Sequence, residues 1–470
     1  MMSPATPPSL VQELAAAIGA EYVEELAEGL RVTPGSAAEV AEVIRRAGAR
    51  KVAVHPVGAG SRPSRFYPAS RGKPDLLHPG PATRGQTDPL HPGSATRSQP
   101  DSLHPGSATR GQPDPLHPRR EPTDDRPRIF ISTSRLDQVL QLDEQSLLVH
   151  AQAGLTGLDL ERILAPRGLS IGDYPPVVLT SSIGGIIAVR TPGKSSARHG
   201  FFEDAVVGVS AVLADGRTVH TRVAPRRSTG PDLSRALCGS EGTIGFITSA
   251  VLRIHIKPEA RLVAAYLLPS VDAAISAIYL AIREECAPSG LRIYDAAEAA
   301  CHFDGLTLPE GHALLCAGTA GPTDLAACDR DLLTSAVIAE GGKVTDHALA
   351  DLWWRRLHAG EPTPGPSPTL QIMATPGKLR AVYRALQATA TQLGATARAH
   401  ISRFDPDGAV MFFTIERSGE LADDTTAAAE HAAEAAGGWL LGARAVKLDA
   451  YLRALRDALD PDRIMNPGTL

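Results

Sequence analysis

Residues 175–204 constrain this chain more than any other stretch, because glycines and hydroxyl side chains are concentrated there. The stretch reads PPVVLTSSIGGIIAVRTPGKSSARHGFFED, with Gly184 and Gly185 shortly after a run of hydroxyl residues. Glycines let a backbone lie close to a ligand, and hydroxyl and N–H groups bind phosphate oxygens. The composition therefore predicts a segment that lies against a flat ligand bearing phosphate groups.

A second glycine-containing turn, PVGAGS at residues 56–61, follows a short predicted strand at 51–55. Converging N–H groups in such a turn can bind phosphate oxygens. The Rossmann fingerprint places a third glycine three positions after the second, and this chain has Pro63 there. The Rossmann pattern is therefore incomplete, and a plain turn stays open as the alternative to a phosphate site.

The length of 470 residues allows two or three domains, each with its own core. Lys and Arg number 47 against 52 Asp and Glu, and the formal charge of -5 is spread along the chain without a basic block. A nucleic-acid partner is therefore not expected. The first residues lack a basic region followed by a continuous apolar run, and no long apolar run occurs elsewhere, so we expect a cytoplasmic protein without a transmembrane segment.

The five cysteines stand far apart, without a CxxC pair. This spacing predicts reduced, buried thiols, and neither a disulfide framework nor a metal site.

Residues 62–126 change abruptly to Pro, Gly, His, Ser and Arg, and they repeat with a period of thirteen. The period spaces four histidines evenly: His78, His91, His104 and His117. The segment has too few apolar residues to build a core, so it predicts a disordered insertion. Metal chelation by these histidines is the alternative, although unstructured His-Pro repeats bind metals weakly.

The remaining pattern predicts an α+β fold. Helices are expected at residues 36–49, 156–167, 271–284, 325–340, 376–393, 424–436 and 446–459. Strands are expected at residues 51–55, 128–133, 146–151, 206–213, 217–222, 246–254, 291–294, 312–316, 370–374, 397–402 and 409–416. Beyond residue 257 the alternation of helices and strands predicts a second α+β domain.

Four motifs in order resemble the FAD-binding domain of the vanillyl-alcohol oxidase superfamily, the PCMH-type fold. They are PVGAGS at 56–61, TSSIGG at 180–185, the segment 188–200, and GSEGTIGFIT at 239–248. The resemblance implies a two-subdomain PCMH-type FAD-binding domain at 1–257, a ferredoxin-like α+β cap domain at 258–436, and a helical C-terminal segment at 437–470 that returns to the flavin.

The resemblance implies non-covalent FAD, held by backbone N–H groups and hydroxyls of the matching motifs. In the first loop the implied FAD-binding residues are Pro56, Val57, Gly58, Ala59, Gly60 and Ser61. In the second region they are Pro176, Thr180, Ser181, Ser182, Gly184, Gly185, Ala188, Val189, Arg190 and Thr191. Farther along they are Glu241, Gly242, Thr243, Ile244, Gly245 and Ile247. His55 and His199 adjoin these segments but match no pattern for a covalent flavin link.

Within that superfamily, residues 224–295 are similar to the alkyldihydroxyacetonephosphate synthase family. The similarity places Arg292 on that family's active-site arginine, and its alternative is an arginine that faces solvent. The tail PDRIMNPG resembles D-lactate and glycolate dehydrogenases, which implies that Asn466 lies near the flavin.

Two departures concern proton transfer. The catalytic tyrosine of the synthase family corresponds to Phe412, and its three consecutive histidines correspond to Gly442, Ala443 and Arg444. A phenylalanine cannot act as an acid or base. Three other histidines could supply a catalytic base in place of the missing cluster, and the sequence singles out none of them: His347, His400 and His431.

The leading hypothesis is an FAD-dependent oxidoreductase that acts on a small alcohol or 2-hydroxy acid. An ether-lipid synthase of the alkyldihydroxyacetonephosphate type and a flavin-binding protein with degraded catalysis are the alternatives. A small-molecule substrate is the expected partner, and a homodimer and peripheral membrane contact stay open.

Overall fold

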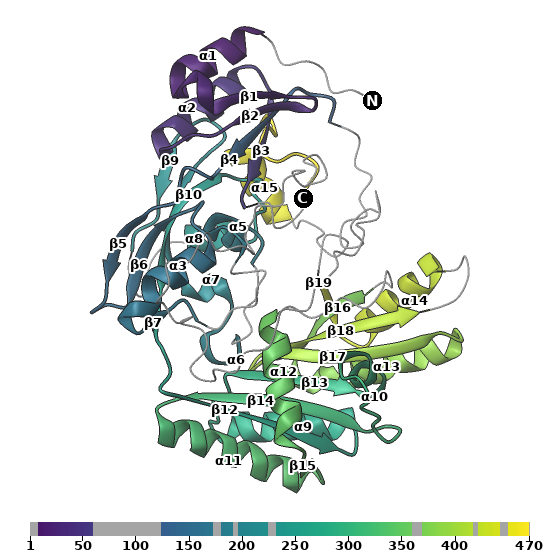
Figure 1. Cartoon of the computed structure of the whole chain (residues 1–470). Coiled ribbons are helices and arrows are strands. Elements are labelled where there is room, and N and C mark those ends of the chain that lie inside the picture. Colours follow the sequence, from purple (N-terminus) through teal and green to yellow (C-terminus); the bar gives the residue numbers. More distant parts are fainter. Residues whose placement is uncertain are drawn as a thin grey trace, which may run out of the picture.

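The computed structural model describes residues 8–59, 124–172, 180–190, 196–223, 232–359, 369–416, 422–441 and 450–469. Residues 60–123 lie outside this set, so the predicted insertion is left untested except for its last three residues. Gly60, Ser61, Pro176 and Thr191 also lie outside it, as do residues 442–444. Figure 1 shows two parts of the chain, a purple and blue part that contains both termini and a green part below it.

The N-terminal part begins with a small sheet of order β1-β2-β4-β3, in which β2 and β3 run parallel to β4. Its strands are β1 (Val23–Leu26), β2 (Gly29–Val32), β3 (Ala53–Val57) and β4 (Arg128–Ser132). Two helices pack with it, α1 (Pro8–Ile18) and α2 (Ala37–Ala49). Helix α2 begins as predicted, because Ser36 Oγ accepts a hydrogen bond from the N–H of Glu39.

A second, antiparallel sheet of order β5-β6-β10-β8-β9 follows (Figure 1). Its strands are β5 (Val139–Asp143), β6 (Leu148–Gln152), β8 (Val206–Val212), β9 (Thr218–His220) and β10 (Phe246–Arg253). The helices of this part are α3 (Gly157–Leu164), α5 (Ile183–Ala188), α6 (Ser196–His199), α7 (Phe202–Ala205) and α8 (Leu233–Leu237). The helix predicted at 156–167 begins as expected with Thr156 as its cap, but α3 ends at Leu164 and a 3-10 turn, η2 (Ala165–Arg167), continues to the left-handed Gly168.

The green part is built on one antiparallel sheet of order β15-β12-β14-β13-β17-β18-β16-β19. Its first half contains β12 (Ala260–Leu268), α9 (Val271–Arg283), β13 (Gly290–Asp295), β14 (Ala313–Gly321), α11 (Thr323–Ala339) and β15 (Lys343–Val344). Its second half contains β16 (Thr369–Ala374), α13 (Pro376–Gln392), β17 (Thr396–Asp405), β18 (Gly408–Glu416), α14 (Ala422–Ala435) and β19 (Trp439–Leu441).

Each half has the element order β-α-β-β-α-β and the strand order 4-1-3-2 of a ferredoxin-like unit. The predicted ferredoxin-like cap is therefore two such units, joined where their second strands, β13 and β17, pair with each other. Strand β19 pairs with β16, so the sheet continues past the predicted cap boundary at residue 436. The sequence prediction missed β12, α10 (Ala296–His302) and α12 (His347–Ala359).

The two faces of this cap sheet differ. Helices α9, α11, α13 and α14 cover one face, against apolar strand residues such as Leu291, Ile293 and Ile401. Side chains alternate along a strand, so Arg292, Tyr294 and their cross-strand neighbours project from the other face. Helix α10 and helix α12 pack on part of that second face, and α6 of the N-terminal part lies against β13 and β17 (Figure 1).

The C-terminal segment returns to the N-terminal part after α15 (Ala450–Leu459). The Asp460 carboxylate accepts hydrogen bonds from the N–H groups of Ile464 and Met465. Met465 then forms a parallel bridge with Val54, and the N–H of Asn466 donates to the Val54 carbonyl at 2.7 Å. The end of the chain is therefore fixed beside β3.

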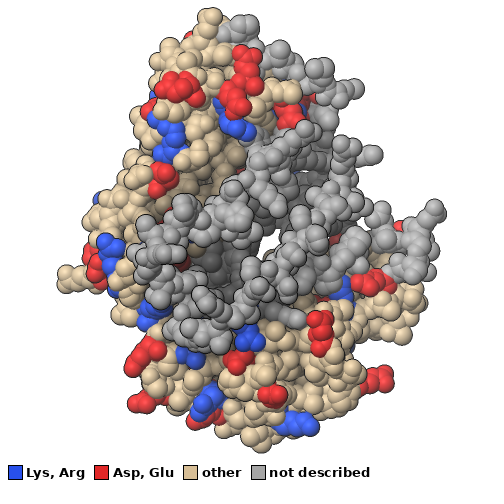
Figure 2. Space-filling model, viewed as in Figure 1, with Lys and Arg blue, Asp and Glu red and all other residues tan. Residues whose placement is uncertain are grey.

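Among the described residues, none of the helices is both long and apolar enough to cross a membrane. On the face in view, acidic and basic side chains are interspersed over the described surface (Figure 2).

We expect that deletion of residues 73–123 leaves FAD binding and the thermal unfolding midpoint unchanged. The deletion stops before Asp124, because the Asp124 carboxylate pairs with Arg126 and the Asp124 backbone carbonyl accepts a hydrogen bond from Arg128. Strands β3 and β4 are parallel neighbours, and a parallel connection needs about a dozen residues, which 58–72 and 124–127 supply. Flavin absorbance per protein measures the outcome, and loss of flavin would show that the insertion is structural.

Candidate active site

Four segments that are distant in sequence meet beside β3. Asn466 joins three of them: the C-terminal segment, β3 and the turn before β10. Its Oδ1 lies 2.9 Å from His55 Nδ1 and its N–H donates to the Val54 carbonyl, both on β3, and its Nδ2 donates to the Glu241 carbonyl at 2.5 Å. The fourth is α5, whose last residue, Ala188, accepts a hydrogen bond at its carbonyl from the N–H of Glu241. The motifs predicted to hold FAD therefore form one continuous region of the protein.

Two glycines of this region stand where a side chain would not fit. A Cβ atom on Gly58 would lie 2.4 Å from Ser182 Oγ, and one on Gly242 would lie 2.8 Å from Pro56 Cγ. Gly242 also has a φ of +78°, which L side chains rarely adopt. The N–H groups of Gly58, Ala59 and Gly242 donate to no residue that the structure describes. Closely packed loops with available backbone donors fit the pyrophosphate of FAD.

The two glycines at the start of α5 use their N–H groups within the protein, and their predicted contact with FAD stays a prediction. The N–H of Gly184 donates to the Ala153 carbonyl at 2.8 Å, and that of Gly185 donates to Ser182 Oγ. A Cβ atom on Gly184 would lie 2.9 Å from Ala153 Cβ. Gly184 therefore lets α5 lie close to Ala153 at the end of β6, and the hydroxyls of Thr180, Ser181 and Ser182 remain as predicted FAD contacts.

The turn before β10 packs on the end of α5. Arg190 Nε donates to the Cys238 carbonyl at 3.1 Å, and the N–H of Gly239 donates to the Ile187 carbonyl. Arg190 and Glu241 both have positive φ, which is uncommon for residues other than glycine. Nearby predicted residues are buried in this turn and the strand after it: Thr243, Ile244, Gly245 and Ile247. Ala188 and Val189 lie at the end of α5 itself.

His55 has a structural role. Its ring is buried, stacks on Phe130 and pairs with Asn466. Burial lowers the pKa of His55 to about 4, although the Asn466 hydrogen bond opposes this, so the imidazole is neutral at pH 7. These contacts account for His55 without a covalent flavin bond.

We predict that His55 makes stability fall as the pH drops from about 6.5 to about 4. The unfolded chain takes up the proton first, so the stabilisation is complete above pH 6.5 and decreases by up to about 1.4 kcal/mol per pH unit below it. His55→Asn keeps a donor to Asn466 but does not titrate. Thermal unfolding midpoints of the protein and this variant should converge towards pH 4, and parallel profiles would contradict the prediction.

Arg292 lies on β13, on the face of the cap sheet opposite to the helix-covered core. It is half-buried, and its Nη1 lies 3.4 Å from the hydroxyl of Tyr294. Helix α6 lies against β13 and β17, so this face is turned towards the N-terminal part. The half-buried position of Arg292 on this face is compatible with the predicted active-site role, which stays a prediction.

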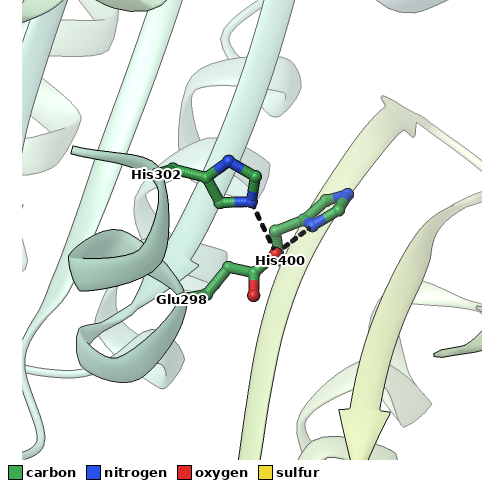
Figure 3. Close-up of side chains that lie close together, drawn as sticks. All are labelled: Glu298, His302 and His400. Carbon is green, nitrogen blue, oxygen red and sulfur yellow. Dashed lines mark hydrogen bonds and ion pairs between the residues drawn. The ribbon is translucent and has the colours of Figure 1, made fainter. Parts of the chain in front are cut away.

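A buried cluster that the sequence did not predict lies next to it (Figure 3). Glu298 and His302 come from α10, and His400 comes from β17. Glu298 Oε1 lies 2.9 Å from His302 Nε2 and 2.9 Å from His400 Nδ1, and Oε2 lies 3.3 Å from Arg398 Nη1. Burial raises the pKa of Glu298, but the hydrogen bonds from both histidines outweigh it and hold the pKa far below its ordinary value. Glu298 is therefore a carboxylate.

The three side chains are of types that ligate metals, and their ligand atoms lie within 4.8 Å of one another. A bound Zn²⁺ sits about 2.0–2.2 Å from its N and O ligands, which places tetrahedral ligand atoms more than 3 Å apart. The 2.9 Å separations match hydrogen bonds instead. The geometry describes a carboxylate that accepts from two imidazoles.

Arg403 is the second guanidinium of this region. It lies within a register irregularity between Ser402 and Asp405 and has a φ of +58°, an uncommon conformation for arginine. Its Cζ lies 5.0 Å from the centre of the Phe412 ring. Burial, together with the positive charge of Arg292, lowers the pKa of Arg403 to about 9. No carboxylate among the described residues forms an ion pair with it, so two like charges stand near each other.

The comparisons with known proteins agree with this architecture. Residues 120–222 match the FAD binding domain family, and residues 257–470 match the family of C-terminal domains of FAD linked oxidases. Alkyldihydroxyacetonephosphate synthase of Caenorhabditis elegans is 31% identical over 173 residues, which are 37% of this chain and 29% of that protein. Glycolate oxidase subunit GlcD of Bacillus subtilis is 32% identical over 161 residues, 34% of each chain.

A solved structure of an alkyldihydroxyacetonephosphate synthase has the same fold, with a TM-score of 0.72 and 19% identity over 100% of this chain and 87% of that one. The matched region covers about a third of the length of each of the two curated relatives. The family matches confirm FAD as the cofactor, and the solved structure confirms the predicted fold class.

Sequence reasoning missed Glu298, His302 and Arg403. A signal was present for the first two, because Asp295 and Glu298 have the spacing of a helix start, and His302 follows Glu298 by one helical turn. No signal marked Arg403, whose position depends on the strand irregularity.

Proposed function

We propose that this chain, which belongs to the PCMH-type FAD flavoproteins, oxidises a small 2-hydroxy acid or a related anionic alcohol. The observation that carries the proposal is the pair Arg292 and Arg403 on the cap-sheet face turned towards the N-terminal part. The relative GlcD is described as a glycolate oxidase subunit, which is consistent with a hydroxy-acid substrate.

The charge of the site favours an anion. Burial and the nearby charge of Arg292 lower the pKa of Arg403, and a carboxylate or phosphate next to Arg403 would stabilise its charged form. Glu298 does not pair with Arg403, because its oxygens are engaged by His302, His400 and Arg398. Since no described carboxylate forms an ion pair with Arg403, an anionic substrate would give this guanidinium a partner.

FAD bound in this region would supply the hydride-accepting chemistry for such a reaction. Arg292 and Arg403 bind the substrate's anionic group and fix which carbon is presented. The loop around Gly58, the hydroxyls of Ser181 and Ser182, and the turn at Gly242 hold the cofactor. Asn466 connects the C-terminal segment to this cradle.

The second candidate is an ether-lipid synthase of the alkyldihydroxyacetonephosphate type. The shared fold and Arg292 favour it, because a phosphate also suits a pair of arginines. Phe412 opposes it, because this position has no hydroxyl to exchange a proton.

Anaerobic titration of the yellow protein separates the candidates. We expect lactate, glycolate or another 2-hydroxy acid to bleach the oxidised flavin. Bleaching by no alcohol or acid, with incorporation of a labelled fatty alcohol into an acyl-dihydroxyacetone phosphate, would favour the synthase. Failure of both reactions would leave a flavin-binding protein with degraded catalysis.

Arg292→Met and Arg403→Met should each weaken binding of the substrate anion about 10- to 100-fold, the loss expected for one charge-assisted hydrogen-bonded contact. The flavin content should not change, because neither residue lies among the loops around Gly58 and Gly242. The dissociation constant of oxalate, measured by its perturbation of flavin absorbance, reports the effect. Arg384→Met is the matched control, because Arg384 pairs with Asp272 at the helix-covered side of the sheet. Unchanged oxalate binding in both site variants would contradict the proposed anion site.

A further inference from the structure

His400 is the member of the buried cluster that reaches the active face. Its side chain is 14% exposed, against 5% for Glu298 and 7% for His302. It stands directly opposite Tyr294 on β13 and Phe412 on β18. Tyr294, the other ionisable side chain among these cross-strand neighbours, is fully buried, so a substrate on the surface cannot reach its hydroxyl.

The contact with Glu298 fixes the ring of His400. A carboxylate accepts, so the 2.9 Å contact places a proton on Nδ1 and leaves Nε2 as the basic nitrogen of the neutral imidazole. The ring stacks on Phe412, with centres 4.5 Å apart and planes inclined by 15°. A base that is held in one tautomer and one orientation is the arrangement that proton abstraction requires.

We infer that His400, positioned by Glu298, accepts the proton of the substrate hydroxyl. This inference rests on the proposed oxidation of a hydroxy acid. The O–H bond breaks and its proton passes to Nε2 of His400, while the C–H bond breaks and its hydrogen leaves with both electrons to N5 of the flavin. The alcohol is oxidised to a carbonyl compound, and FAD is reduced by two electrons.

The spacing of the strands suits one small substrate. Arg292 is two residues from Tyr294 on the same face of β13, and Tyr294 is paired with His400. Such diagonal neighbours on adjacent strands are about 7–8 Å apart. A molecule whose carboxylate binds the Arg292 guanidinium can therefore present its hydroxyl to His400.

Several ionisable groups surround His400. They are Glu298 and His302 from α10, Arg292 and Tyr294 from β13, Arg398 and Arg403 from β17, and Arg198 and His199 from α6, which lies against β17. Variants that change only His400 are needed to separate its effect from theirs.

The test compares two variants of the holoprotein that differ in which imidazole is lost. His400→Asn keeps a donor at the position of Nδ1, and His302→Gln keeps a donor at the position of Nε2, so each preserves a hydrogen bond to Glu298. We expect His400→Asn to slow anaerobic flavin reduction by lactate or glycolate about 10²- to 10⁴-fold, the usual contribution of a general base. His302→Gln should change the rate less than tenfold, and both variants should retain FAD.

Binding of oxalate gives a readout without turnover. In the oxidised holoprotein, the pH dependence of the oxalate dissociation constant should show one titrating group that disappears in His400→Asn and persists in His302→Gln. Thermal unfolding midpoints and flavin content show whether each variant is folded.

Equal reduction rates for the protein and His400→Asn would overturn the inference, as would equal losses in both variants. Stoichiometric zinc or manganese in the purified protein, lost in both variants, would also overturn it in favour of a metal centre. If no hydroxy acid reduces the flavin of the unmodified protein, the proposed function fails and this inference fails with it. If a hydroxy acid does reduce it, the proposed function stands, and the comparison of the two variants tests the role of His400 alone.

Discussion

The carboxyl group of Asp295 holds together the three elements that form the cap-side half of the site. Its Oδ1 accepts from the N–H of Glu298 at the start of α10, and its Oδ2 accepts from the N–H of Ala399 on β17 at 2.8 Å. Burial raises the pKa of Asp295 to about 6, although the two N–H groups oppose this. One side chain at the end of β13 therefore fixes the start of α10 and the position of β17.

That attachment determines which side chains share a face. Because side chains alternate along a strand, a slip of one residue between β13 and β17 would move His400 to the helix-covered core and bring Ile401 to the active face. Asp295 also caps α10, on which Glu298 and His302 lie one turn apart, with Glu298 in contact with His400. Arg398 then completes the pairing of Glu298, so the carboxylate of this cluster is engaged within the protein and does not pair with Arg403.

Local sequence signals predicted much of the fold. Ser36 and Thr156 marked helix starts, Asp215 and Gly216 marked a hairpin, and alternating apolar residues marked most strands. Strand β12 was missed because it is covered on both faces, by one core at Tyr266 and by another at Ala265, so it shows no alternation. The cofactor motifs were recognisable because each is contiguous. The cap-side cluster was not, because Glu298 and His400 are about a hundred residues apart in sequence and meet only through the pairing of two ferredoxin-like units.

Phe412 has a different meaning in the structure than in the sequence. Read alone, it is the loss of a hydroxyl at a position where the synthase family has a catalytic tyrosine. In the folded protein it provides a flat apolar surface on which His400 stacks and over which Arg403 lies. His400 and Phe412 are direct partners across β17 and β18, so their Cβ atoms are about 4.5–5.5 Å apart. In the proposed reaction the proton acceptor is His400 on β17, whereas the synthase family's tyrosine corresponds to Phe412 on the neighbouring strand β18. A residue that cannot titrate at position 412 is then a requirement for holding the imidazole, because a polar ring there would compete with Glu298 and the substrate for its hydrogen bonds.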